Sequence, residues 1–358
     1  MTIVAGIDEA GFGPVLGPLV VSATVFDVPQ ELLDASMWQT LAGTVCRKPS
    51  TKRRSLIPIA DSKKLYSGLR GGSGLDNLER GVLAALACCQ GMSSAPATSV
   101  ALSPAAPSPG EAPSLADTAP KPQAGIRTLG DLLAAVSPAC ESHARQCPWY
   151  AGLDLPLPHC VDPVSSALDA RSLRARLDGA GMKLLGMHSE ILFESEYNRL
   201  VTAVDNKSLL LFDVAGRLLW RVWRSVPAGE HARIFVDHQG GRVHYLQGLQ
   251  LVFDGCQFRV NSESETLSSY TIFDDQRTLT IQFQVQAEDS HLSVALASML
   301  SKFVRELLMV VYNRYWVTHM PNLSPTAGYY SDGRRFFEEI QPLLKHLGLD
   351  GSLLWRCR

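Results

Sequence analysis

The 358-residue sequence contains no apolar run that approaches the length of a membrane span. Residues 16–26 are apolar but short, they include Pro18 and Ser22, and no basic leader precedes them, so we expect no secretory signal. The 8 cysteines show no compact disulfide spacing, and a chain of this length needs no covalent staples. We find no internal repeat. These absences lead us to expect reduced thiols in a cytoplasmic protein.

The sequence also lacks a strong charge of either sign, since its formal net charge is −2. The sequence as a whole is therefore not basic enough to indicate nucleic-acid binding. If the protein binds nucleic acid, its lysines and arginines must be concentrated locally. A hydrophobic fraction of 46% and a charged fraction of 19% are typical of a globular protein with a substantial core.

Strands and helices are predicted to alternate along the chain. Apolar, β-branched residues at 2–4 and 15–26 predict two strands joined by a glycine-rich turn, and a buried strand is predicted at 232–236. Residues 248–286 are β-rich in pattern. Helices are expected near residues 75–89, 129–136, 165–177, 206–223 and 291–316. This interleaving favours an α/β fold.

One segment departs from the rest in composition. Residues 93–123 consist largely of alanine, proline and serine, and almost no large apolar side chain occurs among them. Such a segment cannot bury enough surface to offset the cost of ordering it, so we expect a disordered, solvated loop.

Two adjacent carboxylates, Asp8 and Glu9, stand beside the glycines Gly11 and Gly13. Neighbouring residues of a regular strand point to opposite faces, so both acids can reach one site only at the end of a strand. Glycines let the main chain approach a ligand closely and expose N–H groups to phosphate or hydroxyl oxygens. An isolated Asp-Glu pair would more often be an exposed acidic turn, but the surrounding run is far more specific.

Residues 6–21 read Gly-Ile-Asp-Glu-Ala-Gly-Phe-Gly-Pro-Val-Leu-Gly-Pro-Leu-Val-Val, and this run resembles the opening of the type 2 ribonuclease H family, ribonucleases HII and HIII. The resemblance implies a ribonuclease H-like fold: a mixed central β-sheet flanked by helices, with a C-terminal helical part. It also implies two divalent metal ions held by four carboxylates, which directs attention to two further acids.

Asp237 is the third predicted acid, because it follows the apolar run 234–236 and precedes a polar turn; open α/β sheets usually bind ligands at such a strand end. A simple strand-terminating aspartate is the alternative. For the fourth, the segment Ala297-Ser298-Met299-Leu300-Ser301-Lys302 matches a helical signature of the family. Counting back from it places Glu288 at the acidic position, with Asp289 in reserve.

Four acids suit the hydrolysis of a phosphodiester. The reaction needs an activated water and stabilisation of charge on the attacking and leaving oxygens, which two Mg²⁺ or Mn²⁺ ions supply, and hard oxygen ligands suit both ions. The resemblance implies that Asp8 bridges the metals and that Glu9, Asp237 and Glu288 complete their ligand shells.

Further residues are candidates for contact with nucleic acid. Ser62, Lys63 and Lys64 belong to an Asp-Ser-Lys-Lys-Leu segment at 61–65 that resembles the family's backbone-contacting segment, although two lysines alone usually mark a solvated surface. Lys302, with Arg305 one turn later, could face the same groove or serve helix packing. Gly328-Tyr329 resembles the family's Gly-Tyr pair, whose tyrosine packs against a sugar, and the adjacent Tyr330 leaves the assignment open.

The glycine turn itself, Gly11-Phe12-Gly13, is the last predicted substrate contact, because its N–H groups could read a 2′-hydroxyl. It departs from the family, which usually has arginine where Phe12 stands. The His-Lys pair that commonly precedes Gly-Tyr is Thr326-Ala327 here. These departures bear on substrate preference more than on metal chemistry.

We interpret residues 1–358 as a single catalytic domain whose core spans about 1–65 and 187–345, interrupted by an insert at about 66–186. The insert and the stretch 242–284 exceed what compact family members carry. A zinc site built from residues among Cys140, His143, Cys147, His159 and Cys160 fits no standard spacing.

The leading hypothesis is a monomeric endoribonuclease that cuts the RNA strand of RNA–DNA hybrids, or ribonucleotides embedded in duplex DNA, leaving 3′-hydroxyl and 5′-phosphate ends. Two alternatives stay open: a paralogue that binds hybrids without cutting them, and a metal-dependent nuclease on the same fold with another nucleic-acid substrate.

Overall fold

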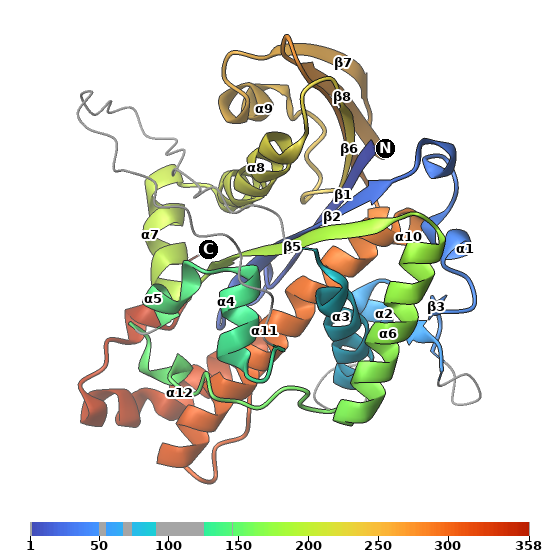
Figure 1. Cartoon of the computed structure of the whole chain (residues 1–358). Helices are drawn as coiled ribbons and strands as arrows, with labels where there is room; N and C mark the ends of the chain where they lie inside the picture. The colour runs from blue at the N-terminus through green and yellow to red at the C-terminus, as the bar shows by residue number, and fades with distance from the viewer. Residues whose placement is uncertain (1, 50–54, 67–73, 91–124, 145, 358) are drawn as a thin grey trace, which may run out of the picture.

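A seven-stranded mixed sheet forms the centre of the molecule, with the strand order β5-β2-β1-β6-β9-β8-β7 (Figure 1). The computed structural model describes residues 2–49, 55–66, 74–90, 125–144 and 146–357. The strands are β1 (Thr2–Ala10), β2 (Leu19–Val28), β5 (Lys183–Leu192), β6 (His231–Asp237), β7 (Gln257–Glu263), β8 (Leu267–Phe273) and β9 (Thr278–Gln284). Two short strands, β3 (Val45–Cys46) and β4 (Ile57–Pro58), pair separately.

The predicted N-terminal hairpin is present, but β1 continues to Ala10 instead of ending near residue 4, and β2 begins at Leu19 instead of near residue 15. β1 pairs antiparallel with β2 from Thr2 opposite Val28 to Ala10 opposite Val20, so the polar Asp8 and Glu9 continue the strand. β6 lies parallel to β1, and β9 lies parallel to β6. The carboxyl ends of these three strands therefore meet at one edge of the sheet.

One face of the sheet is covered by the long helix α11 (Leu292–His319). The helix lies close because Gly6 has no side chain: a Cβ there would approach the backbone of Ser293 to 2.2 Å. The helices α3 (Leu75–Cys88) and α6 (Pro163–Gly179) pack outside it, as Figure 1 shows. This layer holds the larger hydrophobic core.

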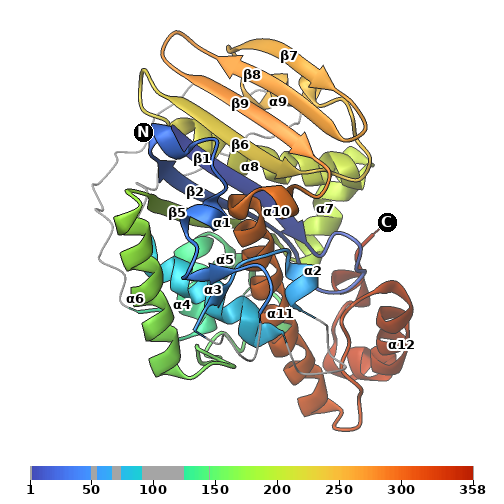
Figure 2. The ribbon, with the colours of Figure 1, turned by 90° about the vertical axis from the view of Figure 1, so that its right-hand side faces the viewer.

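The opposite face is covered by α8 (Lys207–Ser225) and α9 (Leu246–Val252). Burial alternates along β6, so that Ala232, Ile234 and Val236 enter the core beneath α8. Figure 2 shows β9, β8 and β7 fanning out beyond the helices that cover β1 and β2. The remaining helices are α1 (Met37–Thr40), α2 (Ser62–Leu65), α4 (Leu129–Val136), α5 (Cys140–Ala144), α7 (Glu194–Val204), α10 (Ala287–Ser290) and α12 (Tyr330–Leu347).

The predicted fold class, a mixed central sheet flanked by helices with a C-terminal helical part, is confirmed. The β-rich stretch begins with helix α9 rather than with a strand, because Leu246, Leu249 and Val252 recur at helical spacing. The segment predicted to be disordered, 93–123, lies outside the described residues. None of the helices in the described ranges combines the length and apolarity that crossing a bilayer would need.

Candidate metal and nucleic-acid site

Asp8 and Asp237 stand next to each other at the carboxyl ends of two adjacent parallel strands. The register places Ile7 of β1 opposite Val236 of β6, so the next residue of each strand is the acid. Further along the edge, Asp237 lies opposite Gln284 of β9. The chain then reverses at Gln286, whose φ of 55° is left-handed, and enters α10.

This reversal returns Glu288 to the same edge. The first residue of α10 is fastened to β6, because the Ala287 N–H donates to Oδ1 of Asp237 at 3.1 Å. Glu288 follows directly and is only 6% exposed. The four acids predicted from the sequence are therefore gathered at one edge of the sheet.

Two serines of α11 hold the end of β1. The Ser301 hydroxyl donates to the backbone oxygen of Asp8 at 2.9 Å, and Ser298 exchanges a hydrogen bond of 2.9 Å with Ser62 on α2. Oδ1 of Asp8 accepts the N–H of Glu9 at 2.7 Å. The helical signature recognised in the sequence thus contributes hydroxyl groups that fix Asp8 and α2 against α11.

The acids perturb one another strongly. Burial, followed by the charges of Glu9 and Asp237, raises the pKa of Asp8 well above its usual range. Burial and the charge of Asp237 raise the pKa of Glu9 to about 7, and the same two causes raise the pKa of Glu288 to about 7. Crowded carboxylates of this kind are typical of sites that bind a cation or exchange protons.

The donor set fits hard divalent cations, since every predicted ligand is a carboxylate oxygen. Oε2 of Glu288 is buried and has no hydrogen-bond partner within the described ranges. Among those same residues, however, no three carboxylate, histidine or cysteine side chains are already arranged to enclose an ion. The acids are neighbours without forming a finished coordination shell, and the described cysteines and histidines form no alternative zinc site.

Asp289, the reserve candidate, is engaged elsewhere. Lys64 contacts its carboxylate at 2.5 and 2.7 Å, and Arg47 lies 3.7 Å from it. Lys63 differs from Lys64: although its partial burial lowers its pKa, the surrounding acids, led by Asp8 and Asp61, raise the pKa overall. Asp8 and Asp237 raise the pKa of Lys63, whereas the acids that raise the pKa of Lys64 are led by Asp289.

Two other predicted contacts are engaged by neighbouring side chains of the protein. Ser62 is 4% exposed, and its hydroxyl is occupied by Ser298. Lys302 donates to Oε1 of Glu306 at 2.8 Å and sits 4.8 Å above the ring of Tyr66. By contrast, Tyr329 is 54% exposed and immediately precedes α12.

The Gly-Tyr loop rests directly on the segment that follows the glycine turn. The Gly328 oxygen accepts the N–H groups of Val15 at 2.8 Å and Leu16 at 3.2 Å. A Cβ on Gly328, whose φ is 82°, would approach the Leu16 oxygen to 2.3 Å. Two segments more than 300 residues apart in the chain thereby form one surface beside the acids.

Two buried arginines support the turn from beneath: Arg305, which the sequence left open between a groove and helix packing, and Arg356, which sequence reasoning did not identify. Arg305 donates to the backbone oxygens of Leu16 at 3.2 Å and Ala327 at 3.1 Å. Arg356 donates to the Gly11 oxygen at 2.5 Å and lies 3.8 Å from the ring centre of Tyr197. Both arginines are 1% exposed.

The arginine beneath Gly11 orients the next peptide. Because C=O and N–H point in opposite directions across a trans peptide, the inward Gly11 oxygen turns the Phe12 N–H outward. Neither the Phe12 N–H nor the Gly13 N–H makes a hydrogen bond within the described part of the chain, and Gly13 is exposed. The turn presents free donors next to the carboxylates.

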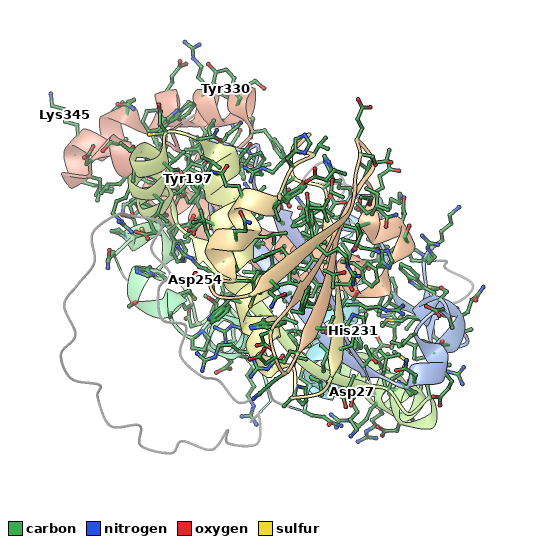
Figure 3. All side chains as sticks on the ribbon, turned by 90° about the horizontal axis from the view of Figure 1, so that it is seen from above. Asp27, Tyr197, His231, Asp254, Tyr330 and Lys345 are labelled. Atoms are coloured by element: carbon green, nitrogen blue, oxygen red, sulfur yellow. The ribbon has the colours of Figure 1, made fainter. Side chains whose placement is uncertain are left out.

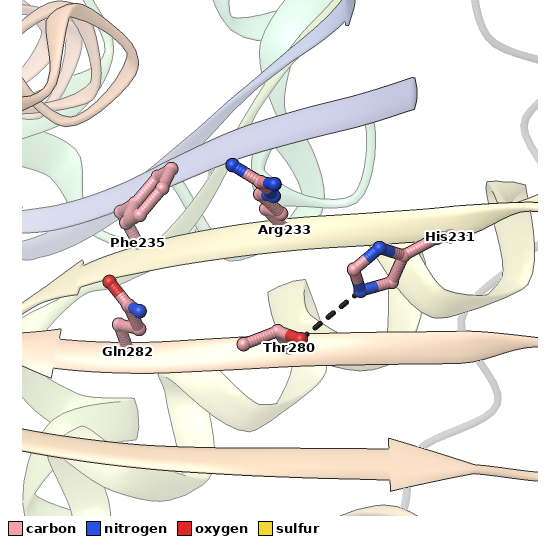
Figure 4. Close-up of a pocket in the computed structure, with 5 residues that line it drawn as sticks. All are labelled: His231, Arg233, Phe235, Thr280 and Gln282. Carbon is pink, nitrogen blue, oxygen red and sulfur yellow. Dashed lines mark hydrogen bonds between the residues drawn. The ribbon is translucent and has the colours of Figure 1, made fainter. Parts of the chain in front are cut away.

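A shallow hollow of about 330 Å³ lies on one face of the sheet, over β6 and β9 and toward the start of β6 (Figure 4). It is lined by His231, Arg233, Phe235, Thr280 and Gln282. His231 and Thr280 are 3.1 Å apart, and Arg233 pairs with Asp34 at 2.8 Å. Figure 3 places His231 and Asp27 far from Tyr330, so the start of β6 lies away from the Gly-Tyr loop.

Divalent cations should stabilise the protein more above pH 7 than below it. The folded pKa values of Glu9 and Glu288 are raised from 4.5 to about 7, so these groups favour the metal-free fold below pH 4.5, and this contribution is lost as the pH rises through 7. Cation binding requires ionised acids, so the free energy of binding becomes more favourable as the pH rises over the same interval. Melting temperatures with and without Mn²⁺ at about pH 6 and about pH 8 test this. An equal shift at both pH values would contradict it.

Comparison with known proteins finds similarity in structure alone, because no family model and no curated protein matches the chain. The PCNA:RNase HII complex from Archaeoglobus fulgidus matches with 14% identity over 99% of this chain and 94% of that chain, at a TM-score of 0.40. Bst-RNase HIII in complex with Mn²⁺ matches with 13% identity over 99% and 66%, at 0.43. The ribonuclease H2 from Pyrococcus horikoshii OT3 matches with 13% identity over 99% and 92%, at 0.39. At these identities and TM-scores, no residue role or activity carries over to this chain.

Proposed function

We propose that the chain is a metal-dependent endoribonuclease that cuts the RNA strand of RNA–DNA hybrids or ribonucleotides embedded in duplex DNA. The observation that carries the proposal is the gathering of Asp8, Glu9, Asp237 and Glu288 at one sheet edge, with pKa values of three of them raised by burial and mutual repulsion. So many carboxylates beside a phosphate chain would repel it unless cations lay between them.

In this proposal the four acids hold two Mg²⁺ or Mn²⁺ ions. When bound, such ions activate water and stabilise charge on the attacking and leaving oxygens of a phosphodiester, which yields 3′-hydroxyl and 5′-phosphate ends. Asp289 stays outside this set, because Lys64 and Arg47 neutralise it. Its ion pairs instead connect α10 to α2 and thereby support the position of Glu288.

The residues around the acids would bind and orient the strand. The outward N–H groups of Phe12 and Gly13 are donors suited to a 2′-hydroxyl, the group that distinguishes RNA from DNA. Tyr329, exposed on the loop that packs against this turn, can stack against a sugar or base. Lys63 places a cation next to the acids, where a backbone phosphate would lie.

We retain the expectations of a monomer and of a cytoplasmic location.

A cleavage assay on four matched duplexes tests the proposal. With Mg²⁺ or Mn²⁺ present, we expect cutting of an RNA–DNA hybrid and of DNA that contains a single ribonucleotide, and no cutting of all-DNA or all-RNA duplexes. Analysis of the product ends should find 5′-phosphates. Equal cutting of the all-DNA duplex would instead favour a nuclease with another substrate.

One observation favours a second candidate, a protein that binds hybrids without cutting them. No three potential ligands within the described ranges converge on a single point. Tight hybrid binding in the absence of metal, together with no turnover in its presence, would support this candidate.

A further inference from the structure

Lys207, the first residue of α8, reaches over the glycine turn. Its ammonium nitrogen lies 5.1 Å from the ring centre of Phe12, which is half-buried against the core beneath α8. The backbone at this position is fixed, because the Asn206 side chain accepts the N–H groups of Ser208 at 2.8 Å and Leu209 at 3.2 Å. The backbone of Lys207 is thus fixed at the start of α8, and its ammonium group lies over the Phe12 ring.

Lys207 has no counter-charge among the described residues. It is exposed, and within the described ranges no carboxylate forms an ion pair with it. Several other cations near the site are engaged: Lys302 with Glu306, Lys64 with Asp289, and both Arg305 and Arg356 with backbone carbonyls. An unpaired ammonium group beside free N–H donors attracts an anion.

Lys207 and Lys63 approach the sheet edge from opposite layers. Lys63 belongs to α2, which is fastened to α11 by the Ser62–Ser298 hydrogen bond. Lys207 begins α8, which covers the other face. The acids lie at the edge between these layers, so a strand that crosses the edge can meet one lysine on each side.

We propose that Lys207 binds a backbone phosphate of the nucleic-acid strand on the α8 side of the site, so that the strand runs from Lys63 across the acids and over Phe12 to Lys207. This inference rests on the proposed function and deepens it. The occupant is a polyanionic strand because spaced ammonium groups and outward N–H donors suit successive phosphates and sugars. The contact is independent of base sequence.

The test measures hybrid binding in an Asp8→Asn background, where turnover is blocked, by anisotropy of a fluorescein-labelled hybrid across a range of KCl concentrations. Lys207→Gln should reduce the slope of log K against log salt by about one unit, and weaken binding about tenfold at about 0.1 M salt. Lys207→Arg, which retains the charge, should preserve the slope. Lys183→Gln is the matched control, because Lys183 is an exposed lysine at the opposite end of the sheet, facing Asp27.

In the protein that retains Asp8 and can cleave, Lys207→Gln should raise KM for the hybrid and leave kcat within about twofold. This is expected of a contact that binds substrate and transition state equally. If the parent binds and cuts hybrids but Lys207→Gln matches Lys183→Gln in slope and Kd, the proposal is overturned and the proposed function stands. If the parent binds no hybrid at any salt concentration, both are overturned.

Discussion

Replacing Asp8 with asparagine should abolish cleavage of RNA–DNA hybrids and, at the same time, make the metal-free protein more stable. Asp8 is 7% exposed, and burial together with Glu9 and Asp237 raises its pKa well above the usual range. Asparagine preserves the shape and removes the charge, so the repulsion among the acids falls. Removing a metal ligand should cost several kcal/mol of transition-state stabilisation, or about a thousandfold in kcat/KM.

Two measurements on one variant check this expectation. Steady-state cleavage of a hybrid should fall to background, and the metal-free melting temperature at about pH 8 should rise by a few degrees. The matched control is Asp27→Asn, on the strand next to β1 and opposite Ile3 at the far end of the hairpin. That control should leave both quantities nearly unchanged. An Asp8→Asn protein that still cuts hybrids, or that melts at a lower temperature than the parent, would refute the interpretation of Asp8 as a metal ligand whose buried charge destabilises the metal-free fold.

Replacing Arg356 with alanine should destabilise the protein by about 1–3 kcal/mol, the cost of leaving buried carbonyl oxygens without their hydrogen-bond donor. Arg356 is 1% exposed, donates to the backbone oxygens of Gly11 and Gly17, and stacks on Tyr197. Nearby Glu194 is fully buried, with a pKa that burial raises to about 7 and that the charge of Arg356 lowers in part. Without the arginine, the carbonyl oxygens lose their donor and the acid loses a counter-charge.

Denaturant unfolding measures the loss, and Arg334→Ala is the control. Arg334 lies in α12 in an exposed ion pair with Glu338, and pairs of this kind contribute at most about 1 kcal/mol. In the fraction of Arg356→Ala protein that remains folded, KM for the hybrid should rise, because the Gly11 peptide is no longer held inward. A loss no larger than that of Arg334→Ala would show that the C-terminal arginine does not support the turn.

The sequence predicted best those features that depend on local pattern. Strand β6 and helices α8 and α11 have apolar periodicities that persist over several turns or residues, and these elements were placed to within a few residues. Asp237 was placed by its position after an apolar strand, whereas Glu288 was placed by the resemblance of residues 297–302 to a helical signature of a known family. Parallel pairing brings Asp8 and Asp237 together, and the reversal into α10 returns Glu288 to them.

Contacts between distant segments could not be predicted in this way. Arg356 meets Gly11 across 345 residues, and Lys207 meets Phe12 from a helix on the other side of the sheet. Nothing in the composition around either cation distinguishes it from an ordinary surface residue. Ser62 shows the reverse: its motif indicated a phosphate contact, whereas its hydroxyl bonds to Ser298 inside the protein. A local sequence pattern identifies candidate residues, whereas tertiary packing determines which of their side chains remain available to a ligand.

Calorimetric titration of Mn²⁺ into the purified protein at about pH 8 tests most directly whether the four acids form a cation site. We predict saturable binding of two ions per chain, and loss of that binding when Asp8 and Asp237 are both replaced by asparagine. Absence of saturable binding, or equal binding by the doubly substituted protein, would contradict a metal site at this edge of the sheet.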